Sequence, residues 1–549
     1  MVTSIVFPLW QYWAHWADLE WHLRRVALGR VVILAVSVDG LVGLRHATLL
    51  LTRLGSLLAP HLPPQSCWVW VFVKGGRTLT ETALTTSRGT HQVHLLLPLI
   101  DTLLPATHAR MYPGRNAALE DVRWRYCSRH GVMGGLCDEH SPDPLPPPPT
   151  ARVAQQSVLA RVPVVVTAGT RQPYLYHTLT TILTAPGVEP QNVLVVLGDE
   201  SQSTVQLLLL LQVAHVMLPA GGATNEQLFR FYRDVFQLVV QRFPDAPYVI
   251  ILDEDVEVSP DFFSFMSQTL PLLQTDPSLS CVTGHAAEGF LGLAHDNTRA
   301  FRGSLQVEWG YGVTLDFVRE ALSLWKTTGQ ITLLYDFWLY INVQKDRECI
   351  FPEVSRTRHF GMGVNTDSYL KEKGPVLMPL VHQAPVALQN VHRLRLDKWQ
   401  EDLARNISRA TTLQGSPCLD SFLPTPPFSP SYVFYYRLTK AECCDGMPEP
   451  YQYSNAVRCL GLWWLSEQGH HRGVTVARFA SNATLFLVGC PYSPYCRLRP
   501  TGLLLWDIDA LTEEEFEYLK TYSPRGSTSV TIANEHANPD SINAMLSEI

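Results

Sequence analysis

Short apolar runs alternate with helical patterns in the middle of the chain. Residues 162–167, 193–197 and 248–252 are continuous apolar runs of strand length, and 213–218 is a weaker one. Between them, apolar residues recur at three- and four-residue spacing over 226–243, which predicts an amphipathic helix. Strands that alternate with helices imply right-handed crossovers and a largely parallel sheet. The predicted fold class is therefore α/β, with helices on both faces of the sheet.

The same patterns divide the chain into four parts. These are a small α+β domain over 1–100, a cysteine-containing and proline-rich linker over 101–160, the α/β domain with a C-terminal extension over 161–510, and a polar tail over 511–549 that we expect to be disordered. Outside the α/β core, strands are predicted at 26–39, 67–73, 93–97, 432–438, 484–489 and 502–506, and a helix at 44–58.

Three consecutive acids, Asp253, Glu254 and Asp255, follow the apolar run at 248–252. The carboxyl ends of strands are where open α/β sheets bind ligands, and alternation along an extended chain would put Asp253 and Asp255 on one side with Glu254 opposite. Carboxylate oxygens suit Mg²⁺, Mn²⁺ or Ca²⁺ and a metal-bridged nucleotide diphosphate. A solvated acidic turn is the alternative that this motif leaves open.

A helix is predicted to follow the acids, with Ser259 as its N-cap, Pro260 at its first position and its end near residue 273.

Other candidate residues also lie at strand ends. Arg171 and Asp199 each follow a predicted strand, so the sheet would bring them to the same crevice as Asp255. Asp336, between two aromatic residues, is a candidate buried carboxylate with the raised pKa that a general base needs. A helix cap or a satisfied core acid is the alternative for Asp336. Segment 349–361 adds cations and a histidine suited to holding phosphate or orienting a carboxylate.

Composition narrows the class of protein. The 549 residues are 46% hydrophobic and 17% charged, which indicates a globular protein of two to four domains. A formal net charge of −7, without a basic run, argues against nucleic-acid binding. No apolar run reaches 18 residues, so the sequence predicts no membrane span.

Cysteines and glycosylation sequons indicate a secretory lumen. The positions of Cys127 with Cys137, and of Cys281 with Cys349, suggest pairing. The two sequons are Asn406-Ile-Ser and Asn482-Ala-Thr.

Taken in order, several motifs resemble one family. They are Val162-Pro-Val-Val-Val-Thr-Ala-Gly-Thr-Arg-Gln-Pro-Tyr-Leu-Tyr176, the strand ending at Asp199, Leu252-Asp-Glu-Asp255 with Pro260-Asp-Phe-Phe263, Tyr335-Asp-Phe-Trp338, and Pro352-Glu-Val-Ser-Arg-Thr-Arg-His-Phe-Gly361. Over about residues 26 to 510 the chain resembles the type-I N-acetylglucosaminyltransferase family, glycosyltransferase family 13. Its first 100 residues resemble a FAM3-like stem domain that lacks its N-terminal part.

The resemblance implies a GT-A fold and an inverting transfer of GlcNAc from UDP-GlcNAc to the 2-hydroxyl of O-linked mannose on glycoproteins. It also implies residue roles: Asp255 for Mn²⁺, Asp253 and Glu254 for the nucleotide sugar, Arg171 and Asp199 beside the uridine, Asn365 near the diphosphate, and Asp336 as the base. It further implies a family disulfide between Cys281 and Cys349. The expected location is the Golgi lumen, as a type II membrane protein whose anchor is not visible in this chain.

Three segments depart from the family pattern. Thr283-Gly-His-Ala-Ala287 stands for Ser-Ala-Trp-Asn-Asp, Phe231-Tyr-Arg233 for His-Tyr-Lys, and Val307-Glu-Trp-Gly-Tyr311 for Pro-Gly-Leu-Gly-Trp. All three changes fall in the expected donor pocket. The alternative function is therefore a catalytically weak or inactive paralogue that binds glycans or acts as a scaffold.

Overall fold

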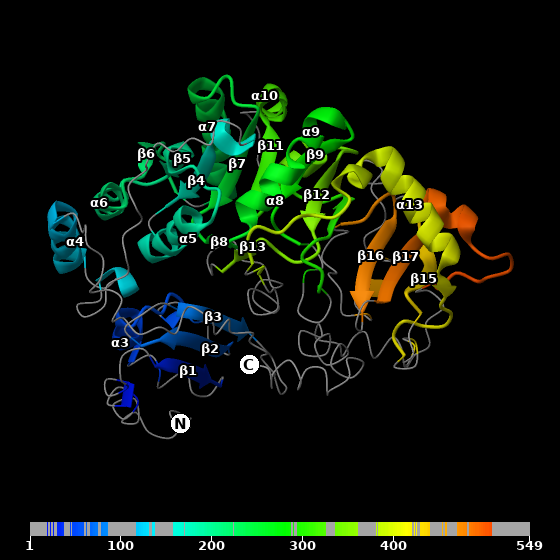
Figure 1. Cartoon of the computed structure of the whole chain (residues 1–549), viewed down its shortest axis with the longest axis horizontal. Coiled ribbons are helices and arrows are strands. Elements are labelled where there is room, and N and C mark those ends of the chain that lie inside the picture. Colours follow the sequence, from blue (N-terminus) through cyan, green and yellow to red (C-terminus); the bar gives the residue numbers. More distant parts are fainter. Residues whose placement is uncertain are drawn as a thin grey trace.

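The structure is a computed structural model of the whole chain (Figure 1). It describes residues 30–37, 47–59, 66–74 and 78–85 with a few neighbours, 117–130 and 134–137, most of 158–325, 335–360 and 380–419, and most of 429–439 and 469–507. The predicted strand at 93–97 and the tail at 511–549 lie outside the described residues.

An eight-stranded sheet forms the centre of the molecule, in the order β10-β12-β9-β11-β7-β4-β5-β6. Its strands are β4 (Val164–Ala168), β5 (Val193–Leu197), β6 (Ala214–Met217), β7 (Tyr248–Asp253), β9 (Leu279–Thr283), β10 (Ala300–Gly303), β11 (Tyr311–Thr314) and β12 (Glu348–Pro352). Strands β7, β4, β5 and β6 are parallel to one another, whereas β11 runs antiparallel between β7 and β9. The predicted α/β class is confirmed.

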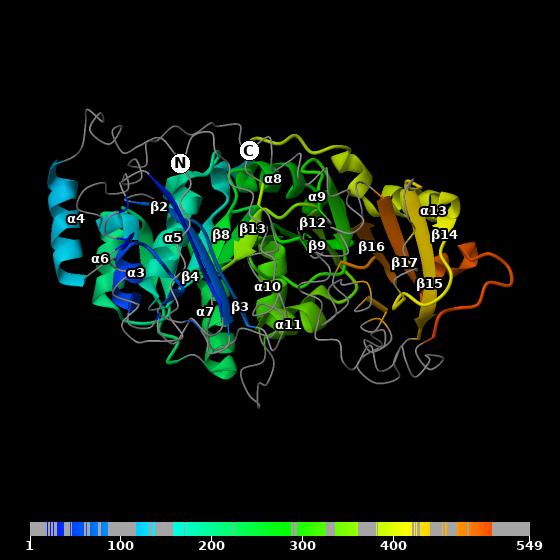
Figure 2. The ribbon, with the colours of Figure 1, turned by 90° about the horizontal axis from the view of Figure 1, so that it is seen from below.

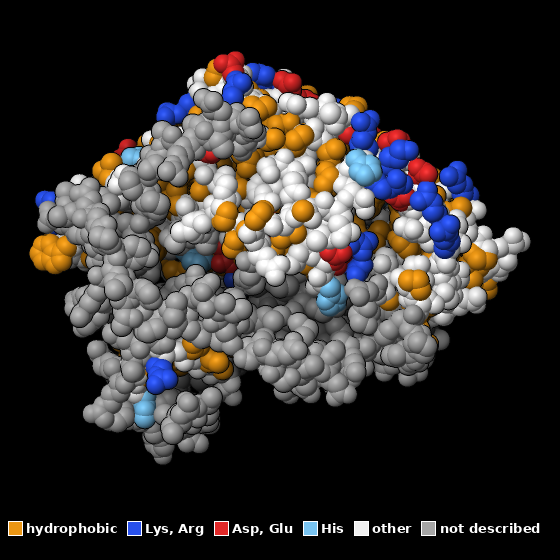
Figure 3. All heavy atoms as spheres, in the orientation of Figure 1, with side chains coloured by type: hydrophobic (Ala, Val, Ile, Leu, Met, Phe, Trp, Pro, Cys, Tyr) orange, Lys and Arg blue, Asp and Glu red, His pale blue; other side chains and the backbone are white. Residues whose placement is uncertain are grey.

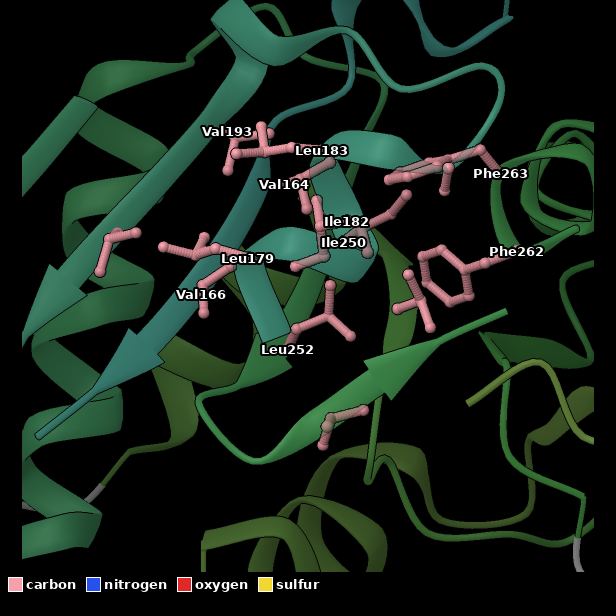
Figure 4. Packing of buried hydrophobic residues seen from close by; sticks show 14 of the residues in the cluster. Val164, Val166, Leu179, Ile182, Leu183, Val193, Ile250, Leu252, Phe262 and Phe263 are labelled. Atoms are coloured by element: carbon pink, nitrogen blue, oxygen red, sulfur yellow. The ribbon is translucent and has the colours of Figure 1, made fainter. Parts of the chain in front are cut away.

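Helices cover both faces of this sheet. They are α5 (Gln172–Thr184), α6 (Gln202–Leu210), α7 (Asn225–Arg242), α8 (Phe262–Thr269), α9 (Leu272–Thr275), α10 (Leu315–Leu324), and α11 (Tyr335–Leu339) with the π-helical turn Tyr340–Gln344. Helix α13 (Leu396–Arg409) packs instead against the C-terminal sheet described below. Val164 and Val166 of β4 face one core, which Figure 4 shows packed against Leu179 and Ile182 of α5. Val165 faces the opposite core, together with residues of α7 and α10. A strand buried on both faces must be apolar at every position, which explains the continuous apolar runs.

The predicted start of the helix after the acids is wrong. Helix α8 begins at Phe262, and Asp261, rather than Ser259, occupies its N-cap position. The carboxylate of Asp261 accepts hydrogen bonds from Arg356 Nε, at 3.0 Å, and from Val386 N, at 2.7 Å, so it is a satisfied buried acid. The predicted single helix also divides at Pro271, which has no N–H group for the helical ladder.

A separate antiparallel sheet, β1-β2-β3, forms the N-terminal part with helix α3 (Thr48–Arg53). Its strands are β1 (Val31–Val36), β2 (Ser66–Val73) and β3 (Thr78–Thr85). Trp68 and Trp70 are fully buried, and Tyr174 and Phe360 of the α/β domain belong to the same apolar cluster. Figures 1 and 2 place this sheet beside α5 and the short strands β8 (Val256–Val258) and β13 (Thr357–His359).

A C-terminal sheet, β14-β15-β17-β16, lies beyond β12 together with α13 (Figure 2). Its strands are β14 (Thr411–Thr412), β15 (Ser431–Leu438), β16 (Val474–Phe479) and β17 (Ala483–Pro491). The strand predicted at 502–506 is wrong, because only Trp506 pairs there, through an isolated bridge to Tyr436.

One helix and several 3₁₀ turns remain among the described elements. They are α4 (Ala117–His130) and the 3₁₀ turns Gly134–Cys137, Val158–Arg161, Pro190–Asn192, Val391–Leu394 and Pro494–Leu498.

Three disulfides join described residues. Cys127–Cys137 and Cys281–Cys349 are the two predicted pairs, and the second links the neighbouring strands β9 and β12. Cys490–Cys496 is a third pair. Within the described part of the chain, no helix combines the length and apolarity needed to cross a membrane.

Candidate active site

Arg171 holds two of the three acids together at the carboxyl ends of β4 and β7. Its Nε lies 2.7 Å from Glu254 Oε1, and its Nη2 lies 2.7 Å from Asp255 Oδ2. Gly169 N donates a further bond to Glu254 Oε2, at 2.8 Å. Strands β4 and β7 are neighbours in parallel register, so the loop after β4 meets the turn after β7. The solvated-turn alternative does not describe this arrangement, because both carboxylates are buried.

The predicted placement of Glu254 on the side opposite Asp255 is wrong, because Arg171 contacts both carboxylates. Strand β7 ends at Asp253, and Glu254 and Asp255 form a turn into β8, so the alternation of an extended strand stops there. Asp253 Oδ1 instead accepts bonds from Thr167 Oγ1, at 2.7 Å, and from the Tyr232 hydroxyl. Burial, followed by the negative charge of Asp255, raises the pKa of Asp253.

His359, at the end of β13, contacts the carboxylate of Asp255. Strand β13 pairs with β8, and His359 Nε2 lies 3.3 Å from Asp255 Oδ2. Burial would raise the pKa of Asp255, but His359 and Arg171 together hold that pKa well below its usual range. Burial lowers and Asp255 raises the pKa of His359, and the net direction is upward. The histidine of segment 349–361 therefore does orient a carboxylate, as its residue type suggested.

The stacked rings of Tyr335 and Tyr232 connect Asp336 to Asp253. Asp336 stands in the first turn of α11, where its Oδ1 accepts a bond of 2.8 Å from Phe337 N. The ring of its neighbour Tyr335 stacks on Tyr232, with centroids 3.4 Å apart, and Tyr232 is the residue that donates to Asp253. Burial raises the pKa of Asp336 to about 6, and the charge of Asp253 acts in the same direction. This pKa is suited to a general base near neutral pH.

Asp199 and Asn365 are not brought into this cluster. Asp199 follows β5 at the correct edge of the sheet, but its side chain is exposed, and none of its described contacts reaches Arg171 or the acids. Asn365 lies outside the described residues. The roles of both residues stay predictions.

Two of the segments that depart from the family pattern meet beside the acids. His285 lies edge-on to Trp309, with ring centroids 4.5 Å apart, and Trp309 lies 5.6 Å from the ring of His359. Burial lowers the pKa of His285 to about 3, so this histidine is neutral at physiological pH. The contact between the two altered segments could not be predicted from the sequence, where they are 24 positions apart in unrelated elements.

The acids fit a divalent ion that the substrate helps to bind. Both contacts to Asp255 use Oδ2, which leaves Oδ1 for an ion. Among the residues that the structure describes, no three His, Cys, Asp or Glu side chains are grouped to hold a metal. Ions of the Mg²⁺ type are commonly bound by one or two carboxylates and completed by substrate phosphates, which is the arrangement these residues allow.

Comparison with known proteins finds a family match in the central part of the chain. Residues 143–373 match the model of the GNT-I family. A relative named alpha-1,3-mannosyl-glycoprotein 2-beta-N-acetylglucosaminyltransferase, from Arabidopsis thaliana, is 28% identical over 114 residues. That match covers 21% of this chain and about a quarter, 24%, of the relative.

Solved structures show a weaker likeness. GalNAc-T7 with UDP, GalNAc and Mn²⁺ has a TM-score of 0.27 and 12% identity, over 36% of this chain and 44% of that chain. Glucosyl-3-phosphoglycerate synthase from Mycobacterium tuberculosis, in complex with Mn²⁺, UDP and glucosyl-3-phosphoglycerate, has a TM-score of 0.25 and 12% identity. The match covers 38% of this chain and 75% of that chain.

Proposed function

We propose that the protein is an inverting glycosyltransferase that moves GlcNAc from UDP-GlcNAc to the 2-hydroxyl of O-linked mannose on glycoproteins. The observation that carries the proposal is the pairing of Arg171 with Glu254 and Asp255 close to Asp336, whose pKa is raised. The stacked rings of Tyr232 and Tyr335 lie between the two parts of the site. The match of residues 143–373 to the GNT-I family and the printed name of the relative support the transfer of GlcNAc to mannose.

The donor is proposed to bind at the carboxyl ends of β4, β5 and β7. Asp255 would hold Mn²⁺, which when bound supplies positive charge to the departing diphosphate. Arg171 orients Asp255 and Glu254, and its partly exposed side chain could also contact a diphosphate. Asp199, Asp253 and Asn365 complete the proposed set of donor contacts.

Asp336 is the proposed base. Its carboxylate takes the proton of the mannose 2-hydroxyl while the hydroxyl oxygen bonds to C1 of the donor sugar. The bond from C1 to the diphosphate breaks on the opposite face, so the configuration at C1 inverts. The Golgi lumen is the proposed location, since the three disulfides indicate an oxidising compartment.

A non-catalytic glycan-binding protein is the second candidate. It is favoured by Arg171 and His359, which already contact Asp255 Oδ2, and by the altered segment around His285. In that case the cluster would be a structural ion-pair network.

A transfer assay separates the two functions. The full chain is incubated with UDP-GlcNAc, Mn²⁺ and an O-mannosyl peptide, next to the variants Asp255→Asn and Asp316→Asn. Asp316 is a matched control, because it is an acid on α10 with a 90% exposed side chain. We expect transfer by the wild type and by Asp316→Asn, and a loss of at least about 100-fold in Asp255→Asn. Binding of the peptide without any transfer would favour the second candidate.

A further inference from the structure

A cavity of about 510 Å³ lies between the α/β domain and the C-terminal sheet, far from the acid cluster in the fold. Its walls come from β10, the turn Val391–Leu394, helix α13 and strands β15 to β17. Phe301, Trp399 and Phe486 provide aromatic surface, and Gln389 and Thr484 provide uncharged polar groups. The charged lining residues are Arg299, Arg393, Asp402 and Arg409. This volume falls within the range of roughly 300 to 1,000 Å³ that is usual for small-molecule sites.

One face of α13 lines this cavity. Trp399, Leu403 and Asn406 follow one another at four- and three-residue spacing, so their side chains share a face of the helix. Leu403 is buried and Asn406 is exposed, so this face of the helix extends from the buried part of the cavity to its solvent-exposed rim. The neighbouring face of the helix is charged, and Figure 3 shows basic and acidic side chains alternating over it.

Asn406 is also the first residue of the sequon Asn406-Ile407-Ser408. Asn406 and Ser408 are exposed, whereas Ile407 is buried in the core under the helix. The three disulfides indicate that the chain folds in an oxidising compartment, which in eukaryotic cells is also where N-linked glycans are added. The acceptor asparagine therefore lies at a cavity whose lining includes aromatic, amide and hydroxyl side chains.

We propose that Asn406 carries an N-linked glycan whose first N-acetylglucosamine lies in this cavity. Aromatic rings suit the apolar face of a pyranose, and amide and hydroxyl groups suit its hydroxyls and acetamido group. A sugar in this position contacts both walls, so it holds the C-terminal sheet against the α/β domain.

The attachment is an ordinary group transfer. The Asn406 amide nitrogen bonds to C1 of an N-acetylglucosamine that a lipid diphosphate carries. The C1–O bond to the diphosphate breaks, and one amide proton leaves as the diphosphate departs. The transfer precedes folding, so α13 needs only to accommodate the product.

The test compares removal of the glycan from the native and from the denatured protein. The full chain is expressed through the secretory pathway of eukaryotic cells behind a cleavable leader, and glycopeptides are mapped by mass spectrometry. We expect a glycan on Asn406 in the wild type and in Ser408→Thr, which keeps the sequon, and none in Asn406→Gln or Ser408→Ala. We also expect peptide-N-glycosidase, which cuts beside the first sugar, to act at least 10-fold more slowly on the native protein.

Two results would overturn the proposal. One is an unmodified Asn406 in the wild type. The other is equally fast removal of its glycan before and after denaturation, which would place the sugar in solvent. The double variant Gln389→Ala with Thr484→Ala is expected to accelerate removal from the native protein, and an unchanged rate would contradict the assigned cavity wall. None of these results depends on transferase activity, so the test is independent of the proposed function.

Discussion

Arg171 and Arg302 each bridge two buried acids, and the two sites differ in what surrounds them. Arg302 Nη1 lies 2.8 Å from Asp276 Oδ2, and its Nε lies 2.7 Å from Glu348 Oε2, with none of its side chain exposed. Arg171 binds Glu254 and Asp255, each at 2.7 Å, but 36% of its side chain is exposed. The pairing chemistry is the same, and access to solvent is the difference.

The Arg302 site is closed by further bonds. Its guanidinium also donates to Leu394 O, at 2.9 Å, and to Ser278 Oγ, at 2.8 Å. His471, from the C-terminal part of the chain, lies 2.6 Å from Glu348 Oε1 and joins that part to the central sheet. A buried charge network with its donors satisfied has a structural role, whereas the Arg171 site retains an open side for a ligand.

Arg302→Met should give the largest change in stability. It leaves Asp276 and Glu348 buried without their cation, which costs about 3 to 5 kcal/mol of unfolding free energy. Denaturant unfolding measures the loss. Arg319→Met is the control, since its pair with Asp316 is exposed and contributes at most about 1 kcal/mol. Equal losses in the two variants would contradict the assignment of Arg302 as structural.

Arg171→Met should lower the unfolding free energy less than Arg302→Met does, and it should weaken the binding of UDP-GlcNAc. Solvent can reach the two acids once the half-exposed guanidinium is removed, so we expect a loss of about 1 kcal/mol of unfolding free energy. Titration with UDP-GlcNAc in the presence of Mn²⁺ should show a dissociation constant raised at least about 10-fold. A stability loss as large as that of Arg302→Met, with unchanged donor binding, would make the two sites equivalent.

The smallest expected effect is the change that Asp336→Asn makes to the pH dependence of stability. The folded pKa of Asp336 is raised to about 6, above its ordinary value of 3.8, so the folded state prefers the protonated form. Its contribution therefore weakens the fold as pH rises from about 4 to about 6, and the full penalty persists above that range. Asp336→Asn should gain about 1 kcal/mol at pH 7.5, after allowance for partial exposure. Thermal unfolding at pH 5 and pH 7.5 checks this: the gain should shrink at pH 5.

The elements of the sheet could be predicted because their signals are local. The apolar run at 193–197 matches β5 residue for residue, and α7 begins at a capping box formed by Thr224 and Gln227. Strand β3 was missed because its alternating threonines are polar and its buried Glu81 is satisfied by distant partners, among them Leu57 N and Trp68 Nε1. A carboxylate buried by contacts so distant in sequence leaves no local pattern.

The sequence could predict which residues belong to the site, but not which of them contact one another. The strand ends indicated Arg171 and Asp255, because parallel strands deliver their carboxyl ends to one edge. Asp336 was indicated by the aromatic residues on both sides of it. Which acids Arg171 binds depends on the turn after Asp253, where the alternation stops. The contact of His359 with Asp255 depends on the pairing of β13 with β8, about 100 residues apart.

The pH profile of GlcNAc transfer by the wild type and by Asp336→Asn is the most direct test of the central claim. If Asp336 is the base, kcat/KM of the wild type rises with pH through about 6, as this carboxyl loses its proton. Asp336→Asn should then lose about 10²- to 10⁴-fold in rate and the pH dependence, with UDP-GlcNAc binding unchanged. Transfer by Asp336→Asn at the wild-type rate, with the same pH profile, would contradict the account.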